Sequence, residues 1–376
     1  HDSNLPLVLW LQGGPGASSL FSYFFETGPH TFANPPGSEP HLSARPSPWS
    51  EVANILYIDS PVGTGFSFCQ QESKETCYAK DEATLAADVH AALSSFLGKH
   101  PRYVDRAFYI FGESYAGKMA PNIASGLSTA GVRLELRGVG LGDGWVDPVH
   151  QNRALVTYAL STGLIGRNQA RKLQPTVDAC VSAIQRHAYV EAYDKYCYYH
   201  ILNAVATANV SVYDVRKLHD TSAQQSQWMG DYLTRDDVVS ALHASSVRPF
   251  DADVTGVESA LIADLNAPTA TPHLAPLLNA GVQLLVYSGQ FDLICNLVGT
   301  DAWVDDLTWN HTTAFASAER SPWIVNGQVL GWKQEGGGLT RIVVADAGHM
   351  APGDQPLAGQ HLLRHLIATT KLAKKE

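Results

Sequence analysis

The sequence has no apolar run long enough to cross a membrane as a helix, and its longest candidates, such as Leu5–Leu11, have the length of buried strands. Charged residues are also scarce, at 16% against 45% hydrophobic residues, which excludes an intrinsically disordered chain. No repeat of fixed period and no low-complexity tract is present. A chain of 376 residues can bury one large core, so we expect one large domain with a segment inserted into it.

Positive charge is in deficit, with 26 lysines and arginines against 36 aspartates and glutamates, for a net charge of -10. Such a surface repels phosphate backbones, so nucleic acid is not an expected partner. The 15 histidines would gain protons near about pH 5 and cancel much of that charge. This is weak evidence in favour of an acidic compartment.

Cysteine is also sparse, with five residues. We expect two local disulfides, Cys69–Cys77 and Cys180–Cys197, which leaves Cys295 as a free thiol, although connectivity does not follow from spacing alone. Glycosylation sequons begin at Asn209 and Asn310, and chance matches to that pattern are common. Together with paired cysteines, the sequons favour the secretory route.

Several short apolar runs are each followed by a glycine-rich or polar turn. Their hydrophobicity is continuous rather than alternating, which is typical of parallel strands covered on both faces. Helix-like stretches, of which Asp81–Leu97 is the clearest, lie between several of these runs and indicate an α/β architecture. The expected strands are Leu5–Leu11, Asn54–Asp59, Ala107–Phe111, Arg137–Leu141, Val282–Tyr287 and Arg341–Ala345.

Strand signals nearly vanish from about Trp145 to about Thr255, where the composition favours helices. We therefore expect a first part of the core at 1–144, an inserted, mostly helical cap at 145–255, and a second part of the core at 256–376. The end of the cap is less well defined than its start, because Val238–Leu242 also fits a helix that returns to the core.

The segment GESYAG at 112–117 follows an apolar run and precedes an expected helix, Lys118–Leu127. In a nucleophile elbow, a serine occupies a strained turn between strand and helix, and the positions two before and two after it are small. Here those positions hold Gly112 and Ala116. The alternative is a glycine-bearing turn with an incidental serine, but the strand–turn–helix context favours Ser114 as the nucleophile of an α/β-hydrolase fold.

A serine hydroxyl needs a base that removes its proton. In α/β-hydrolases the acid and then the histidine follow the serine along the chain, each on a loop after a strand. Asp292 and His349 meet that order and context, and His349 follows a late apolar run through a glycine turn. Asp346 is a rival for the acid, but it lies too close in sequence to His349. The predicted triad is Ser114, Asp292 and His349.

The segment GGPG at 13–16 follows the first expected strand. Glycines allow backbone N–H groups to approach a developing negative charge. We assign the N–H groups of Gly14 and Tyr115 as the oxyanion donors. A plain tight turn is the alternative, and the motif alone does not exclude it.

Several blocks resemble the serine carboxypeptidase family, and they occur in the family's order: WLQGGPG at 10–16, DSPVGTGFS at 59–67, GESYAG at 112–117 and GHM at 348–350. The blocks GDGWVDP at 142–148 and QFD at 290–292 are similar to those of vitellogenic-like carboxypeptidases. The resemblance extends over nearly the whole chain and is weakest in the expected cap.

The resemblance implies an α/β-hydrolase fold, with a mostly parallel central sheet, helices on both faces and an inserted cap. It implies release of C-terminal amino acids from peptides at acidic pH, through an acyl-enzyme on Ser114 and without a cofactor or metal. It also implies that Gln12, Gly13, Glu26 and Glu113 bind the terminal carboxylate of the substrate. Many relatives have asparagine in place of Gln12, and Glu26 by itself is typical of a solvated loop acid.

The partners implied are peptide or protein C-termini, and a homodimer is among the expected assemblies because family members are often dimers. The expected location is the secretory pathway, in a lysosome-like or vacuole-like acidic compartment or outside the cell. The alternatives are an acyltransferase, an esterase or lipase, and a binding protein that keeps the fold. The intact triad opposes the last of these, and the carboxylate-binding set opposes a general esterase.

Overall fold

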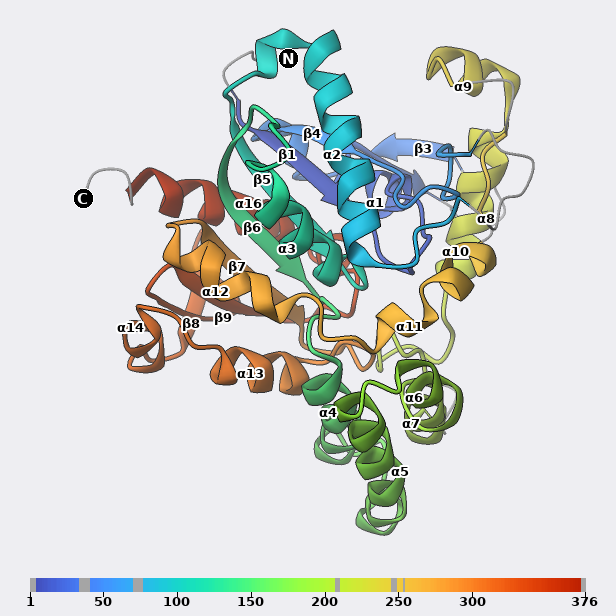
Figure 1. Cartoon of the computed structure of the whole chain (residues 1–376), viewed down its shortest axis with the longest axis vertical. Helices are drawn as coiled ribbons and strands as arrows, with labels where there is room; N and C mark the ends of the chain where they lie inside the picture. The colour runs from blue at the N-terminus through green and yellow to red at the C-terminus, as the bar shows by residue number, and fades with distance from the viewer. Residues whose placement is uncertain are drawn as a thin grey trace.

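The computed structural model of the protein describes residues 5–33, 41–69, 77–206, 210–244, 249–252 and 254–372. A central sheet with helices on both sides makes up the body of the molecule, and a group of helices extends from one end of it (Figure 1). The fold is therefore of the α/β class, as the alternation of apolar runs and helical stretches predicts.

The central sheet has eight strands in the order β4-β1-β5-β6-β7-β10-β9-β8. The six strands from β4 to β10 run parallel, and β9 and β8 join antiparallel at one edge. Parallel strands end at the same edge of a sheet, so the loops after β1, β5, β7 and β10 leave the sheet on one side. The strands are β1 (Leu7–Leu11), β4 (Asn54–Tyr57), β5 (Ala107–Glu113), β6 (Glu135–Gly142), β7 (Gln283–Gly289), β8 (Ser321–Val325), β9 (Gln328–Gly336) and β10 (Leu339–Val344).

Helices cover the sheet on both faces, which explains the continuous hydrophobicity of its strands. Leu9 belongs to the core on one face and Trp10 to the core on the other. The first face is covered by α2 (Glu82–Lys99), α3 (Ala116–Gly126), α12 (Thr271–Asn279) and α13 (Leu297–Asp306), and the second by α16 (Pro356–Leu372) (Figure 1). Strands that are buried on both sides have no solvent face at which polar residues could alternate.

Capping residues define where two of the long helices begin. Asp81 precedes α2, and its side chain accepts the backbone N–H of Thr84 at 2.8 Å. Asp147 plays the same part for α4 (Pro148–Ser161), where it accepts the N–H of Val149 at 2.9 Å. Each bond satisfies one of the backbone N–H groups that a first helical turn leaves without a partner.

The regular secondary structure described between β6 and β7 is helical, apart from one bridge between Gly65 and Asp251. Its helices continue past Thr255, so the division at residues 144 and 255 stays a prediction. The helices are α4, α5 (Arg167–Gln185), α6 (Tyr189–Lys195), α7 (Tyr199–Val205), α8 (Ser222–Leu233), α9 (Asp236–Ala241), α10 (Thr255–Ala260), α11 (Ile262–Leu265) and α12.

The apolar pattern did not predict four strands: β8 and β9 at the sheet edge, and the antiparallel hairpin β2 (His30–Ala33) and β3 (His41–Ala44). Both pairs have partly exposed residues, so neither reads as an apolar run. The remaining short elements are α1 (Leu20–Phe25), η1 (Trp49–Glu51), η3 (Pro101–Tyr103), α14 (Thr312–Ala316) and α15 (Ala351–Asp354).

The cysteines pair as the sequence predicts, with disulfides Cys69–Cys77 and Cys180–Cys197 and a buried free thiol at Cys295. Asn310, in the second sequon, is exposed, whereas Asn209, in the first, lies outside the described residues. A search of the described residues found no helix with the length and apolarity needed to cross a membrane.

This pairing predicts the result of a thiol titration. The folded protein should show no fast-reacting thiol, because Cys295 is only 2% exposed and burial raises the pKa of its thiol well above the ordinary value. After unfolding without a reductant, one thiol per chain should react, and after reduction all five should. Three reactive thiols in the unreduced, unfolded protein would show that one of the disulfides is absent.

Candidate active site

Ser114 occupies a tight turn between β5, which ends at Glu113, and α3. Its φ of 58° lies in the left-handed region, which few residues other than glycine adopt and which is often found at functional sites. The turn is held by β6, because the Ser114 N–H donates to the carbonyl of Gly142 at 3.2 Å. A Cβ on Gly112 would lie 2.1 Å from the carbonyl oxygen of Ala116, so only glycine fits there. This is the geometry expected of a nucleophile elbow.

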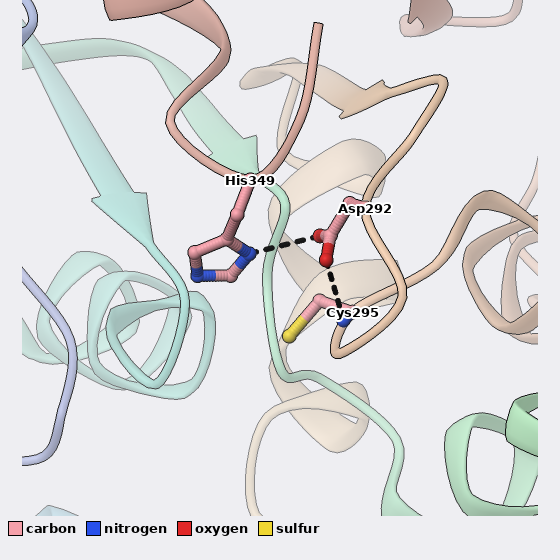
Figure 2. A group of neighbouring side chains, drawn as sticks. All are labelled: Asp292, Cys295 and His349. Carbon is pink, nitrogen blue, oxygen red and sulfur yellow. Dashed lines mark hydrogen bonds and ion pairs between the residues drawn. The ribbon is translucent and has the colours of Figure 1, made fainter. Parts of the chain in front are cut away.

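Asp292 follows β7 and His349 follows β10, and the two side chains meet at the same edge of the sheet. His349 Nδ1 lies 2.8 Å from Asp292 Oδ2, with both side chains buried (Figure 2). The carboxylate therefore places the proton on Nδ1 and leaves Nε2 as the basic nitrogen. His349 Nε2 has no hydrogen-bond partner among the described residues, and Ser114 forms no hydrogen bond with it.

Cys295 lies beside this pair, and its backbone N–H donates to Asp292 Oδ1 at 3.1 Å (Figure 2). The side chains of Asp292, Cys295 and His349 each have a ligand-type atom within 4.8 Å of the others, the only such group in the part of the chain that the structure describes. The imidazole and the carboxylate are already bonded to each other, and the raised pKa of the thiol keeps it protonated. These groups suit proton transfer better than metal binding.

Asp143 is a buried site residue to which the sequence analysis gave no role. Its Oδ1 accepts the N–H of Gly289 at 2.7 Å, at the end of β7, while its Oδ2 has no donor among the described residues. Burial raises its pKa well above the ordinary value, and the negative charge of Asp292 adds to the rise. A neutral Asp143 would carry a proton that its free Oδ2 can donate, and Asp292 is the neighbouring acid whose charge favours that proton. Its place at the carboxyl end of a predicted parallel strand was the available signal.

The glycine loop after β1 lies directly against the elbow. A Cβ on Gly13 would lie 2.5 Å from the Cβ of Ser114 and 2.6 Å from the backbone nitrogen of Tyr115. Gly14 has a φ of 108°, which favours glycine. The backbone N–H groups of Gly14 and Tyr115 have no acceptor among the described residues. Both predicted donors are therefore free to bind an oxyanion.

Three of the four predicted carboxylate-binding residues, Gln12, Glu26 and Glu113, belong to one buried group of polar side chains, and the fourth, Gly13, lies in the loop beside them. Gln12 Nε2 donates to Glu113 Oε1 at 2.9 Å, and the hydroxyl of Ser22 contacts the oxygen of Gln12 and, at 2.7 Å, Glu26 Oε1. Trp10 Nε1 donates to Gln12 Oε1 at 3.1 Å and fixes the orientation of the amide. Glu26 is 1% exposed, so its environment is not that of a solvated loop acid.

Burial raises the pKa of both Glu26 and Glu113, and for Glu113 the negative charge of Glu26 is the second cause. The two carboxyl groups act on each other's pKa as close neighbours, and the Oε2 atom of each has no hydrogen-bond partner among the described residues. Two carboxylates cannot bond without a proton, so the pair is set up to share one. The charge of Arg45 also acts on Glu26, but the Arg45 guanidinium donates to the backbone carbonyls of Gly28 and Phe24.

Comparisons with known proteins agree with this geometry. A model of the serine carboxypeptidase family matches residues 1–369. Serine carboxypeptidase-like 49 of Arabidopsis thaliana is 34% identical over 378 residues, which cover 97% of this chain and 71% of that protein. Serine carboxypeptidase S10 family member 1 of Dictyostelium discoideum is 33% identical over 379 residues, which cover 96% of this chain and 86% of that protein.

Among solved structures, Kex1Δp, a prohormone-processing carboxypeptidase from Saccharomyces cerevisiae, matches with a TM-score of 0.85 over 97% of this chain and 83% of that chain. At 23% sequence identity this likeness concerns the fold, and it confirms an α/β-hydrolase with a mostly parallel sheet. The family match covers nearly the whole chain, and relatives above 30% identity extend over most of their own length. The chain therefore belongs to the serine carboxypeptidase family, whose members are hydrolases of the exopeptidase type.

Proposed function

We propose that the protein releases C-terminal amino acids from peptides at acidic pH, through an acyl-enzyme on Ser114. The observation that carries this proposal is the buried group of Gln12, Glu26 and Glu113, one member of which precedes the nucleophile directly in the chain. A general esterase has no need of two buried acids beside its serine. An enzyme whose substrate ends in a carboxylate can use such acids to bind it, provided that one of them carries a proton.

The proposed chemistry gives each residue of the triad one role. Ser114 Oγ attacks the scissile carbonyl while His349 Nε2 accepts its proton, and Asp292 stabilises the resulting imidazolium through Nδ1. The same proton then passes to the nitrogen of the departing amino acid. Water then attacks the acyl-enzyme in the same way, with His349 again accepting and returning a proton, and the shortened peptide is released. The N–H groups of Gly14 and Tyr115 stabilise the negative oxygen that forms in both steps.

The acid pair gives the proposed pH range its physical basis. The proton shared by Glu26 and Glu113 can be donated to the terminal carboxylate of the substrate, and Gln12 holds Glu113 in place. Loss of that proton replaces a hydrogen bond with repulsion between negative charges. Substrate binding should therefore be strongest on the acidic side of the pair's raised pKa. With two disulfides and an exposed sequon at Asn310, an acidic compartment of the secretory route is the proposed location.

The first test uses a peptide with a free C-terminus and its amidated twin. Wild-type protein should release the terminal residue of the free peptide with a kcat/KM at least about tenfold above that for the amide, because a hydrogen bond to a charged group is lost. Ser114→Ala should lower kcat by about 10⁴-fold or more, since the triad acts as a unit. Mass spectrometry of the products measures both effects. Equal rates on the two peptides would point to an esterase or amidase instead.

A second test concerns the glycine loop. Gly13→Ala should lower kcat/KM by about 100-fold or more, because its Cβ would displace either the loop or the elbow and misplace an oxyanion donor. Gly98→Ala, in α2, is the matched control, since a Cβ there meets nothing within 4 Å. This control should keep full activity and gain about 0.5–1 kcal/mol in unfolding free energy. Full activity in Gly13→Ala would remove the loop from the proposed oxyanion hole.

The third test follows the pH dependence of KM. Because the raised pKa values keep a proton on the Glu26–Glu113 pair at acidic pH, KM for peptides should rise as pH increases from about 5 to about 8. Amidated or ester substrates should show a much weaker rise, because they lack the terminal charge. Glu113→Gln supplies an uncharged amide donor and should flatten the rise. The carboxylate-binding role would be wrong if KM stayed level in the wild type, or rose unchanged in both Glu113→Gln and Glu26→Gln.

A further inference from the structure

Residues 212–217, with the sequence VYDVRK, cross the region where the triad loops leave the sheet. They lie between α7 and α8, within the segment inserted between β6 and β7, and form no helix or strand. Neither the sequence motifs nor the proposed chemistry gives them a role. They nevertheless contact the loop that carries Asp292 and the loop that carries His349.

The contacts with the acid loop involve the residues on either side of Asp292. The N–H of Val215 donates to the carbonyl of Phe291 at 3.0 Å, and the carbonyl of Val212 accepts the N–H of Leu293 at 3.2 Å. The loop is thus bonded on both sides of the catalytic carboxylate. Backbone groups on both partners make these bonds, so the position of the acid depends on where residues 212–217 run.

The contact with the base is made to His349 itself, whose N–H donates to the carbonyl of Tyr213 at 2.7 Å. The Tyr213 ring also packs against the imidazole, with ring centroids 5.2 Å apart. Gly348 permits this approach, since a Cβ there would lie 2.5 Å from the Tyr213 oxygen and 2.8 Å from the Cβ of Asp214. The base loop is therefore packed against the same segment as the acid loop.

A group of charged side chains fixes the segment to the base loop. Asp214, whose side chain is 4% exposed, accepts from Arg216 Nε and Nη2, both at 2.8 Å, and from Lys217 Nζ at 3.0 Å. Lys217 also donates to Asp354 Oδ1 at 3.2 Å, and Asp354 Oδ2 accepts the N–H of Gly348 at 2.7 Å. Burial alone would raise the pKa of Asp214, but the hydrogen bonds from Arg216 and Lys217 outweigh it and lower the pKa. Asp214 is thus a buried carboxylate whose charge is paired, and loss of that charge would leave Arg216 and Lys217 without their shared partner.

We propose that residues 212–217 are a positioning strap that sets the geometry of the Asp292–His349 pair, with the Asp214 ion pairs as its lock. The strap acts through the two catalytic loops, to which its backbone is hydrogen-bonded. Proton transfer depends steeply on this geometry, since misplacement by about 1 Å can cost about 100-fold in rate. The inference rests on the proposed serine mechanism, because it assigns the strap to the acid and base of that mechanism.

The test is Asp214→Asn, which keeps the size of the side chain and removes its charge. Peptide kcat should fall by about 10- to 100-fold, while KM stays within about twofold because Gln12, Glu26 and Glu113 are untouched. The rate at which a serine-directed phosphonate labels Ser114 should fall in parallel. Backbone amide exchange at His349 and Leu293 should become faster, because the acceptors of both N–H groups lie on the strap.

Glu335→Gln is the matched control, since Glu335 also pairs with two basic side chains, Lys333 at 2.6 Å and His365 at 3.5 Å, on a strand that carries no triad residue. Its kcat and labelling rate should equal those of the wild type. Asp214→Glu, which keeps the charge, should recover part of the lost kcat. The proposed positioning role would be wrong if Asp214→Asn kept wild-type kcat and wild-type amide exchange. It would also be wrong if the control lost as much kcat as Asp214→Asn.

If Asp214→Asn does not fold, Arg216→Gln replaces it in the same comparison, because the Arg216 side chain is 35% exposed and its guanidinium also covers the ring of Phe291 at 4.6 Å. Failure of the proposed function is a separate result. A wild-type protein that releases no C-terminal residue would refute carboxypeptidase activity. Phosphonate labelling and amide exchange would still test the strap, since they require only the triad.

Discussion

The hydrogen bond between His349 Nδ1 and Asp292 Oδ2 joins two loops that leave the sheet after neighbouring parallel strands. Because β5, β7 and β10 all end at the same edge, Ser114 reaches that edge as well. Gly289, where a Cβ would lie 1.9 Å from the carbonyl oxygen of Gly348, lets the acid and base loops approach so closely. Gly112, where a Cβ would lie 2.1 Å from the carbonyl oxygen of Ala116, allows the tight turn that carries Ser114. The rest of the site is arranged around this bond, since the bond decides which imidazole nitrogen is free to accept a proton.

Buried carboxyl groups surround the triad, and their protonation sets the conditions in which the site is stable. Burial raises the pKa of Glu113 and of Asp143, and raises that of Glu82 to about 8. Both Glu82 oxygens lack a hydrogen-bond partner among the described residues, and the charge of Asp264 adds to the rise. A carboxyl group with a raised pKa favours the folded state most below its ordinary pKa, and that stability is lost as pH rises through the higher value. For Glu82 the loss extends from about pH 4.5 to about pH 8, which is compatible with the acidic pH range that we propose for the activity.

The sequence was informative where local pattern determines structure. The run at Leu7–Leu11 was predicted because burial on both faces leaves no polar positions. Strand β9 was missed because it lies near the sheet edge and only one of its nine residues is buried. The triad followed from chain order and strand context. Glu26 was different, since its environment depends on Ser22 and Glu113, which no local pattern places beside it. Asp143 was hidden for the same reason, because its partner Asp292 lies far along the chain.

Residues 212–217 show a further limit of prediction, because they act mainly through backbone groups that every residue type possesses. Residues of other types at positions 212 and 213 would have the same backbone carbonyls as Val212 and Tyr213 and could form the same bonds. Only the charges of Asp214, Arg216 and Lys217 stand out in the sequence of this segment. A short charged stretch on a loop normally indicates a solvated surface. In the structure, the bonds between this stretch and the triad loops make the inserted helical region part of the frame that holds the acid and the base. A change in the inserted region can therefore shift the acid and the base and alter the rate of proton transfer.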